Sequence, residues 1–369
     1  MSQAKLLKLL DKAIGKPLVL LLGLIKTSNE PSLEDIEQIL VIRPGGIGDA
    51  VLLLPAIQKL KSLYPKVLID VLAEKRNAEI FRLSPCVDGL FLYDRPKDLM
   101  RIARRSYNVI IDSEQWYRLS AVAARMIRAR RRIGFGTNER GRLLSDRIHY
   151  SQDTSESQNF MQLLEPLNAT QTQLVARSPV FNIPIGVSNS LKKLVHLDRH
   201  KQIVIIFPGS SNEQKRWHVS KFIKIAQKLI GKSCQVIIVG GKSDIPVGEA
   251  IAAGAQSSVH YCGRLSLAET AALLKDASLV ISGDSGVMHM AAALDKKIVA
   301  LFGPSNEKKW APMGENHIVI NKHLPCSPCT IFGHTPTCKK GAKCMELITP
   351  EEVFGKAVEL LEWKADTFD

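Results

Sequence analysis

The chain has 369 residues, of which 45% are hydrophobic and 23% are charged, a balance that excludes a disordered or collagen-like protein. Lys and Arg (50) outnumber Asp and Glu (36), and the formal charge of +14 favours an anionic partner. No apolar run reaches the roughly 18 residues that span a bilayer, and we expect no cleavable signal peptide. The seven cysteines do not resemble a secreted disulfide framework, so we expect a reducing cytosol.

Residues 5–26 have the spacing of an amphipathic helix that lies on a surface. At about 100° per residue, four lysines share one side and five aliphatic residues the other: Lys5, Lys8, Lys12 and Lys16, against Leu6, Leu10, Ile14, Leu21 and Ile25. Pro17 interrupts the pattern and allows two shorter helices. The surface is either a membrane interface or the body of the protein, and the pattern leaves both open.

From Gln38 onward, strands alternate with helices, which predicts parallel sheets covered on both faces. Before residue 150 we predict strands at 38–43, 67–73, 89–93, 108–112 and 132–135, and a helix at 50–63. After residue 200 we predict strands at 202–207, 236–239, 278–281 and 297–302, and helices at 219–230, 245–253, 285–294 and 350–363. Thr349 is expected to cap the last helix.

Loop-forming residues between about 167 and 199 separate these two series. We therefore predict an N-terminal extension (1–37), a first α/β domain (38–175), a linker (176–199), a second α/β domain (200–349) and a C-terminal helix (350–369). Two α/β halves joined in this way predict a ligand cleft between them.

The first candidate functional motif runs from Arg43 to Asp49 (Arg-Pro-Gly-Gly-Ile-Gly-Asp), between a predicted strand and a predicted helix. Glycines let the backbone approach a ligand, and a helix start offers N–H groups to an anion or a sugar oxygen. The spacing is not that of the dinucleotide-binding GxGxxG fingerprint. Asp49 is either a catalytic carboxylate or an acid that only complements the helix dipole.

A second motif follows the strand that ends at Phe207. It places Ser210 and Ser211 in a loop and Lys215 and Arg216 before the next helix. Hydroxyl groups, a lysine and a helix start suit a phosphate. The alternative is a polar loop with solvated cations.

A third motif runs from Gly283 to His289 (Gly-Asp-Ser-Gly-Val-Met-His) and leads from a strand into a helix. Asp284 or Ser285 can cap this helix, Gly286 allows close approach, and His289 lies one turn after Ser285. A phosphate at this helix start would be stabilised by N–H groups and the dipole. The motif alone is also compatible with a purely structural capped helix.

The stretch 91–150 contains 14 Lys or Arg and six Asp or Glu, a net charge of +8. On a helix, Arg118, Arg125, Arg128 and Arg132 would share one side and suit an anionic membrane or a phosphorylated glycolipid. A solvated helix face is the alternative. Nucleic acid fits less well, because the stretch lacks interleaved aromatic residues for base stacking.

The late cysteines have the spacing Cys326-x2-Cys329-x8-Cys338-x5-Cys344. Four thiols within 19 residues would allow a tetrahedral zinc site, with disulfides or free thiols as the alternatives. Such a zinc ion would be structural, because four thiolates leave no open position.

Taken together, the three motifs resemble those of glycosyltransferase family nine, the lipopolysaccharide heptosyltransferases. The resemblance rests on 41–52 with Pro55-Ala56-Ile57, on 208–211 with 215–217, and on 284–289 leading into 300–305, and it covers about 39–361. It implies a GT-B fold, in which the first Rossmann-like domain binds the acceptor and the second binds the nucleotide sugar.

The resemblance also implies roles for individual residues. Asp49 aligns with the catalytic aspartate of an inverting heptose transfer from ADP-heptose that has no obligatory metal. The donor-binding residues implied are Ser210, Ser211, Lys215, Asp244, Asp284, Ser285, Gly286 and His289. The acceptor-binding positions that we expect are Gly46, Ile47, Gly48, Arg118, Arg125 and Arg128. Ser285 stands where the family motif has Thr, which keeps the hydroxyl.

The partners implied are ADP-heptose and an anionic phosphorylated glycolipid, with the enzyme at the cytosolic face of the inner membrane and no nucleic acid. The acceptor stays open, because Gly45-Gly46-Ile47 replaces the serines typical of the first core heptosyltransferase. Two other classes stay open: a nicotinamide-dependent oxidoreductase, which the α/β alternation alone allows, and a basic zinc-bearing nucleic-acid-binding protein, which the charge and the cysteines suggest.

Overall fold

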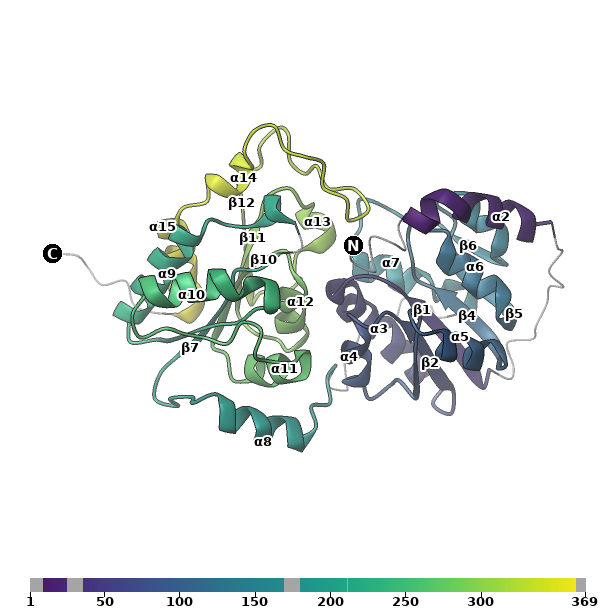
Figure 1. Cartoon of the computed structure of the whole chain (residues 1–369), viewed down its shortest axis with the longest axis horizontal. Coiled ribbons are helices and arrows are strands. Elements are labelled where there is room, and N and C mark those ends of the chain that lie inside the picture. The colour runs from purple at the N-terminus through teal and green to yellow at the C-terminus, as the bar shows by residue number, and fades with distance from the viewer. Residues whose placement is uncertain (1–8, 25–35, 169–179, 211, 363–369) are drawn as a thin grey trace. The chain divides into compact units, whose positions relative to one another are not determined.

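The structure is a computed structural model that describes residues 9–24, 36–168, 180–210 and 212–362 (Figure 1). The chain divides into two compact units, Met1–Asn182 and Ile183–Asp369. The point of division lies within 176–199, the range predicted as linker. That range also contains helix α8 (Ile185–Leu194), where the sequence predicted only loops.

The first unit is built on a six-stranded parallel sheet with the order β3-β2-β1-β4-β5-β6. Its strands are β1 (Gln38–Arg43), β2 (Leu68–Ala73), β3 (Gly89–Leu92), β4 (Ser106–Asp112), β5 (Arg128–Phe135) and β6 (Asp146–Ile148). Its helices are η1 (Asp11–Gly15), α2 (Lys16–Leu22), α3 (Ile47–Leu63), α4 (Ala78–Arg82), α5 (Pro96–Ala103), α6 (Leu119–Met126), η3 (Glu139–Leu143), α7 (Glu156–Gln162) and η4 (Glu165–Leu167). Five of the six β1 residues are buried, which explains its unbroken apolar run.

The second unit has its own six-stranded parallel sheet, with the order β12-β11-β10-β7-β8-β9. Its strands are β7 (Ile203–Phe207), β8 (Gln235–Ile238), β9 (Val259–His260), β10 (Leu279–Gly283), β11 (Ile298–Phe302) and β12 (His317–Asn321). Besides α8, its helices are η5 (Glu213–Lys215), α9 (Val219–Gly231), η6 (Lys242–Asp244), α10 (Ile245–Gly254), α11 (Leu267–Lys275), α12 (Gly286–Ala293), α13 (Glu307–Trp310), α14 (Lys343–Glu346) and α15 (Pro350–Leu361). The two parallel sheets confirm the predicted fold class.

The two sheets have the same winding. Numbered from the first strand of each unit, both read 3-2-1-4-5-6, the order in which ligands bind beyond the carboxyl ends of the strands where the order reverses. These switch points lie between β1 and β4 and between β7 and β10. Ile42 pairs with Asp112 and Phe207 with Ser282, so the loops after each pair begin side by side.

The N-terminal helix packs on the first unit through a face that the sequence did not single out. Asp11 and Val19 are buried, and Val19 belongs to a small apolar cluster with Ala121, Val122 and Leu143. Asp11 Oδ1 accepts backbone N–H bonds from Arg118 (2.6 Å) and Leu119 (2.8 Å), at the start of α6. A π-helical turn (η1) precedes Pro17, which agrees with the predicted interruption. Lys5, Lys8, Leu6 and Ile25 lie outside the described residues.

The C-terminal helix α15 belongs to the core of the second unit. Thr349 Oγ accepts the Glu352 N–H, so the predicted cap is confirmed. Val353 and Ala357 are fully buried in a cluster that also contains Phe222 of α9. Three strands (β6, β9 and β12) and helix α11 were not predicted; β6 and β9, with three and two residues, are too short to show a periodicity.

Candidate active site

The predicted glycine-rich motif forms the turn from β1 into α3. Gly45 has a φ of +117°, a backbone conformation that favours glycine, and Gly46 is the N-cap of the helix. Ile47 and Gly48 are the first two helical residues, so Asp49 lies in the first turn. A carboxylate at this position is stabilised by the positive end of the helix dipole.

Arg43, the last residue of β1, orients Asp49. Its Nη2 lies 3.1 Å from Asp49 Oδ2 and 3.7 Å from Glu114 Oε2, and its Nη1 donates to the Ser113 carbonyl at 2.7 Å. Burial alone would lower the pKa of Arg43, but Asp49 and Glu114 raise it above its ordinary value. Because 2% of the Arg43 side chain and 20% of the Asp49 side chain are exposed, a fixed cation holds a carboxylate that solvent can reach.

Arg43 was not predicted as a site residue, although its sequence context carries one signal. A charged residue ends an otherwise apolar buried strand, and such a charge needs a partner. Behind it, Gln115 donates to Glu156 Oε1, and the Tyr150 hydroxyl donates to Glu156 Oε2 at 2.7 Å. Burial and, to a smaller extent, the charge of Glu156 raise the pKa of the Tyr150 hydroxyl far above its ordinary value, so Tyr150 stays a neutral donor. This buried network fixes Arg43 from below.

A cavity of about 60 Å³ lies at the same edge of the first sheet. It is lined by residues that follow β1, β2 and β4, among them Gly45, Glu74 and Glu114, and also by Tyr93 and Asp11. The N-terminal helix therefore contributes a side chain to the neighbourhood of the Asp49 motif. Acceptor binding by Gly46, Ile47 and Gly48 remains a prediction.

The expectation that four arginines share one helix face is wrong. Helix α6 ends at Met126 and β5 begins at Arg128, so Arg128 and Arg132 lie on a strand. Arg132 is buried and donates to the carbonyls of Ala124, Ile127 and Ala129, which turns the chain from α6 into β5. The helical projection failed because alternation along a strand and helical spacing both suit this short basic run.

The three arginines proposed for the acceptor have different surroundings. Arg118 is the N-cap residue of α6 and pairs with Glu139 at 2.8 Å, so its charge is already partnered. Arg125 lies in the last turn of α6, and Arg128 is exposed at the start of β5. A role of these side chains in acceptor binding remains a prediction.

In the second unit, the loop after β7 is held by its own side chains. Ser210 Oγ accepts the Asn212 N–H, and the Ser210 carbonyl accepts two bonds from Arg216, at 3.2 and 3.0 Å. Lys215 ends η5, directly after this loop. Ser211 lies outside the described residues. Arg216 therefore shapes the loop, whereas the sequence suggested only a second cation for a ligand.

Asp284, after β10, brings together groups from three segments. Its Oδ2 accepts Lys215 Nζ at 2.8 Å and Ser305 Oγ at 2.5 Å, and its Oδ1 lies 3.8 Å from His289 Nε2. Burial by itself would raise the pKa of Asp284, but the nearby His289 and the charge of Lys215 hold it well below its usual range. Ser305, which follows β11, was not predicted as a site residue, although it ends the family-like stretch 300–305.

The predicted donor motif forms the start of α12. Ser285 is the N-cap; its Oγ accepts the Met288 N–H at 3.2 Å and lies 2.8 Å from Ser282 Oγ. Gly286 is the first helical residue. His289 is buried, and its Nδ1 has no hydrogen-bond partner among the described residues. The cluster of Lys215, Asp284 and this helix start forms one charged edge at the second switch point.

Asp244 lies beneath the same edge. It is buried, its Oδ2 accepts the Gly241 N–H at 2.9 Å, and a Cβ at Gly209 would lie 2.5 Å from that oxygen. Asp244 therefore packs directly against the loop that carries Ser210, and Gly209 has to be glycine for this approach. Its predicted contact with the donor nucleoside stays a prediction, since one carboxylate oxygen already caps η6.

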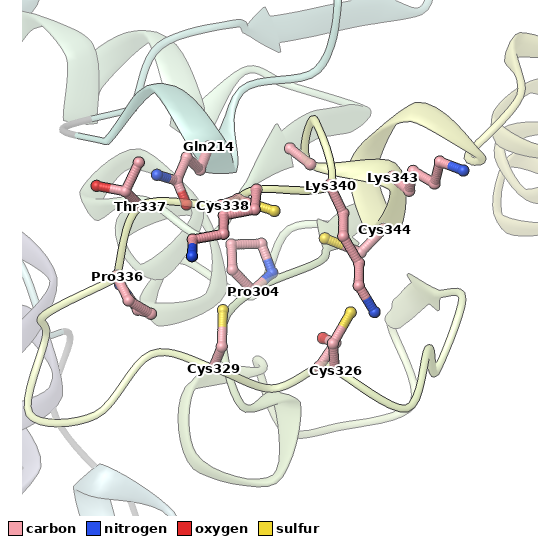
Figure 2. Close-up of a pocket in the computed structure, with 13 residues that line it drawn as sticks. Gln214, Pro304, Cys326, Cys329, Pro336, Thr337, Cys338, Lys340, Lys343 and Cys344 are labelled. Carbon is pink, nitrogen blue, oxygen red and sulfur yellow. The ribbon is translucent and has the colours of Figure 1, made fainter.

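All four late cysteines line a single cavity of the second unit, of about 200 Å³ (Figure 2). All seven cysteines of the chain are free thiols. As placed, no group of three or more His, Cys, Asp or Glu side chains in the described ranges is arranged to hold a metal ion. The four thiols therefore lie around one space, and zinc binding by them stays a prediction.

Comparisons with known proteins agree with this geometry. The sequence profile described as "Glycosyltransferase family 9 (heptosyltransferase)" matches residues 99–338. The chain belongs to glycosyltransferase family 9. It is similar to lipooligosaccharide heptosyltransferase 2 of Haemophilus ducreyi, with 28% identity over 77% of this chain and 88% of that protein. It is also similar to lipopolysaccharide heptosyltransferase 3 of Escherichia coli, with 26% identity over 73% of this chain and 85% of that protein.

A solved structure extends the likeness to the fold. The structure of ADP-heptose lps heptosyltransferase II from E. coli matches with a TM-score of 0.73 and 22% identity, over 88% of this chain and 98% of that one. This family 9 glycosyltransferase therefore has the expected GT-B type of fold. Membership of the family also decides against the oxidoreductase and the nucleic-acid-binding protein that the sequence pattern left open.

Proposed function

We propose that this family 9 enzyme transfers a heptose from ADP-heptose to a hydroxyl of the lipopolysaccharide inner core, with inversion at the anomeric carbon. The observation that carries the proposal is the placement of the motifs. A carboxylate held by a buried arginine lies at the switch point of one sheet, and a lysine–aspartate pair beside a capped helix start lies at the switch point of the other. The names of the relatives supply the sugar and the acceptor class.

In this mechanism Asp49 accepts the proton of the acceptor hydroxyl. The hydroxyl oxygen forms a bond to the anomeric carbon, while the bond from that carbon to the phosphate oxygen breaks and ADP leaves with the electron pair. A base at this step requires a reachable carboxylate in a fixed orientation, which matches the partly exposed Asp49 on the buried Arg43. The reaction as proposed requires no metal.

The second unit would stabilise the leaving diphosphate. Negative charge develops on the phosphate oxygens as the bond breaks, and a positioned cation and helix N–H groups lower the energy of that charge. Lys215 supplies the cation, and Asp284 holds Lys215 Nζ at 2.8 Å. The start of α12 at Ser285 and Gly286 supplies the helix terminus. Ser210 and the unit's other predicted donor residues complete the proposed binding surface.

The test is release of ADP from ADP-heptose over a panel of truncated lipopolysaccharide acceptors, with the anomeric configuration of the product read by NMR. Asp49→Asn should keep the fold and ADP binding but lose at least about 100-fold in turnover, the scale of general-base loss. Asp153→Asn, at an exposed position of the same unit, is the control and should keep full activity. Near-normal turnover of Asp49→Asn would remove Asp49 from the role, and retention of configuration would contradict inversion.

The donor contacts are tested separately by nucleotide binding. Lys215→Ala and Ser285→Ala should each weaken ADP-sugar or transition-state binding by about 1–3 kcal/mol, through lost charge-assisted or buried hydrogen bonds. Ser285→Thr keeps the hydroxyl that caps α12 and is the matched control, with near-normal binding expected. If both alanine variants bind and turn over normally, the phosphate site lies elsewhere.

We further propose that the N-terminal helix holds the enzyme at an anionic membrane surface. In the described part of the chain, no helix has the length and apolarity needed to cross a bilayer. The face opposite Asp11 and Val19 is nonetheless apolar and open to solvent; its exposed residues are Leu9, Leu10, Ile14, Leu20, Leu21 and Leu24. Lys12 and Lys16 are exposed on the same helix, and each basic residue near an anionic surface contributes about 1 kcal/mol.

Point variants test this better than deletion of residues 1–30, because the deletion would also remove the Asp11 cap of α6 and uncover the site of Val19. Vesicles that contain phosphatidylglycerol should bind the wild type at low salt and release it as salt rises. A Leu10→Ser, Leu21→Ser double variant should bind less, while Leu68→Ser, at an exposed leucine of β2, should bind normally. Activity on a lipid-free acceptor should survive in all three proteins. Wild type that ignores these vesicles at low salt would refute membrane docking.

A further inference from the structure

The cysteine loop, residues 322–344 in the second unit, connects β12 to α14 and contains no helix or ladder strand before Lys343. Its pairing is limited to an isolated bridge between Ile331 and His334. Pro328, Gly333, Pro336 and Gly341 interrupt it, and few of its side chains are buried. A loop of this length without a core of its own needs another source of order.

The four thiols of the loop lie around one space. Figure 2 shows Cys326 and Cys329 on one segment and Cys338 and Cys344 on the opposite segment, with Pro304 between them. Besides the four thiols, the cavity of about 200 Å³ is lined by three lysines, one glutamine, one serine, one threonine, two prolines and one alanine, so no carboxylate or imidazole competes with the thiols there.

Two of the thiols are fixed to the body of the unit. Cys344 is buried at the start of α14, and a Cβ added at Gly303 would meet its sulfur at 3.0 Å. The Cys329 N–H donates to the Pro304 carbonyl at 3.0 Å. Cys326 is exposed and Cys338 is half-buried, so less of the protein packs around these two sulfurs. Closing a tetrahedral site requires only that the sulfurs approach to roughly 3.8 Å, the spacing set by Zn–S bonds of about 2.3 Å.

The positive charges around the cavity would balance the negative charge of a zinc ion bound by four thiolates. One Zn²⁺ with four thiolates carries a net charge of about −2. Lys339, Lys340 and Lys343 line the same cavity and would offset that charge.

We propose that Cys326, Cys329, Cys338 and Cys344 bind one Zn²⁺ ion in a four-thiolate site that orders the cysteine loop. Four thiolates leave no open coordination position, so the ion is structural and takes no part in glycosyl transfer. The site is separate from the proposed reaction, and its failure would leave the roles of Asp49 and Lys215 untouched.

Hydrogen bonds connect the cysteine loop to the residues proposed to bind the donor. The loop N–H groups of Cys329 and Thr330 both bond the Pro304 carbonyl, and the next residue, Ser305, donates to Asp284. An ordered loop therefore holds the segment that positions the Lys215–Asp284 pair. Removal of the ion should loosen this segment and lower the melting temperature of the protein by about 2–8 °C, which corresponds to a loss of about 1–2 kcal/mol in a unit of this size.

The experiment is metal analysis of the full chain, purified without a polyhistidine tag from medium that contains zinc and iron. Wild type should carry about one zinc per chain, and the metal-free protein loaded with Co²⁺ should show thiolate charge-transfer bands and strong tetrahedral visible bands. Cys326→Ser and Cys338→Ser, both at positions that are not buried, should lose the ion and the bands. Cys234→Ala, at a buried thiol elsewhere in the same unit, is the control and should keep both.

Several results would overturn the proposal. One is wild type with less than a tenth of an ion per chain and no thiolate bands with Co²⁺. Another is full retention of zinc by both serine variants. Fewer than seven titratable thiols in the unfolded, unreduced protein would assign the cluster to disulfides, and stoichiometric iron in place of zinc would refute the assignment of the ion.

Discussion

The pair formed by Lys215 and Asp284 offers a quantitative test of how the second unit is held together. Its charged atoms lie 2.8 Å apart, and 14% and 12% of the two side chains are exposed. At that distance of 2.8 Å and an effective dielectric constant of about 20, the attraction is about 6 kcal/mol before desolvation is counted. Removing one partner of a buried pair costs about 3–5 kcal/mol, and the residual exposure places this pair near the lower end.

Asp284→Asn keeps the shape of the side chain and an acceptor for Ser305 but leaves Lys215 without its counter-charge. We expect the free energy of unfolding of the second unit to fall by about 3 kcal/mol at pH 7. Urea unfolding, followed by hydrogen exchange of the β7 and β10 amides, reports on this unit alone. Asp198→Asn breaks an exposed pair, with 3.7 Å to Lys201 and 36% exposure of the Asp198 side chain. That control should cost about 0–1 kcal/mol.

The pH dependence gives a second readout. Burial raises the pKa of Asp284, but the nearby His289 and the charge of Lys215 outweigh it, so the folded pKa lies well below the ordinary value. A depressed carboxyl pKa stabilises the fold fully above the unfolded value of about 3.9, and this contribution is lost as the pH falls toward the folded value. The deficit of Asp284→Asn should therefore be constant from pH 7 to about 5 and shrink below about pH 4. A deficit equal to that of the control, or one unchanged at pH 3, would refute this account.

Three further predictions concern contacts elsewhere in the chain. Arg43→Gln should lower turnover by about 10- to 100-fold, because Asp49 loses its fixed orientation, and should leave the affinity for ADP unchanged. Steady-state kinetics measures the turnover and calorimetry measures the affinity. Unaltered turnover would remove Arg43 from this role. Val19→Ala truncates a fully buried side chain and should weaken the docking of the N-terminal helix by about 2 kcal/mol of free energy. The expected readout is faster hydrogen exchange over residues 9–24. Unchanged exchange would mean that the helix does not depend on this contact. Burial and, to a smaller extent, the charge of Asp244 raise the pKa of the Cys262 thiol to about 12. Iodoacetamide at pH 8 should therefore modify Cys262 only when the protein unfolds, whereas the exposed Cys326 should react in the native protein without bound metal. Mass spectrometry distinguishes the two sites, and rapid labelling of Cys262 in the native protein would contradict its burial.

Several features of this protein could be predicted from the sequence because their causes are local. The apolar run of β1 follows from burial of a central parallel strand. The caps of α12 and α15 depend on a side-chain oxygen and an N–H three residues away, so Thr349 could be identified directly and the cap of α12 could be limited to Asp284 or Ser285. The order of the three motifs along the chain was sufficient to suggest the family.

Other features depend on segments that are distant in sequence. Lys215 and Asp284 lie 69 residues apart and meet only because β7 and β10 are neighbours in the sheet. Ser305 joins them from the end of β11. Arg43 gave no periodic signal, since its burial and its partners come from the ends of β1 and β4. No local pattern encodes which strand ends will lie together.

The basic segments show the same division. The sequence correctly placed a helix near the N-terminus, but its docked face is defined by Asp11 and Val19, because only the folded unit offers the free N–H groups of α6 and an apolar site beside them. The arginines from 118 to 132 fit a helix in projection, yet the strand β5 begins at Arg128, where pairing with β4 supplies hydrogen bonds that the local sequence cannot reveal. Spacing along the chain thus determined the elements and their caps, whereas the sheet order, which is set by burial over the whole unit, decided which side chains meet.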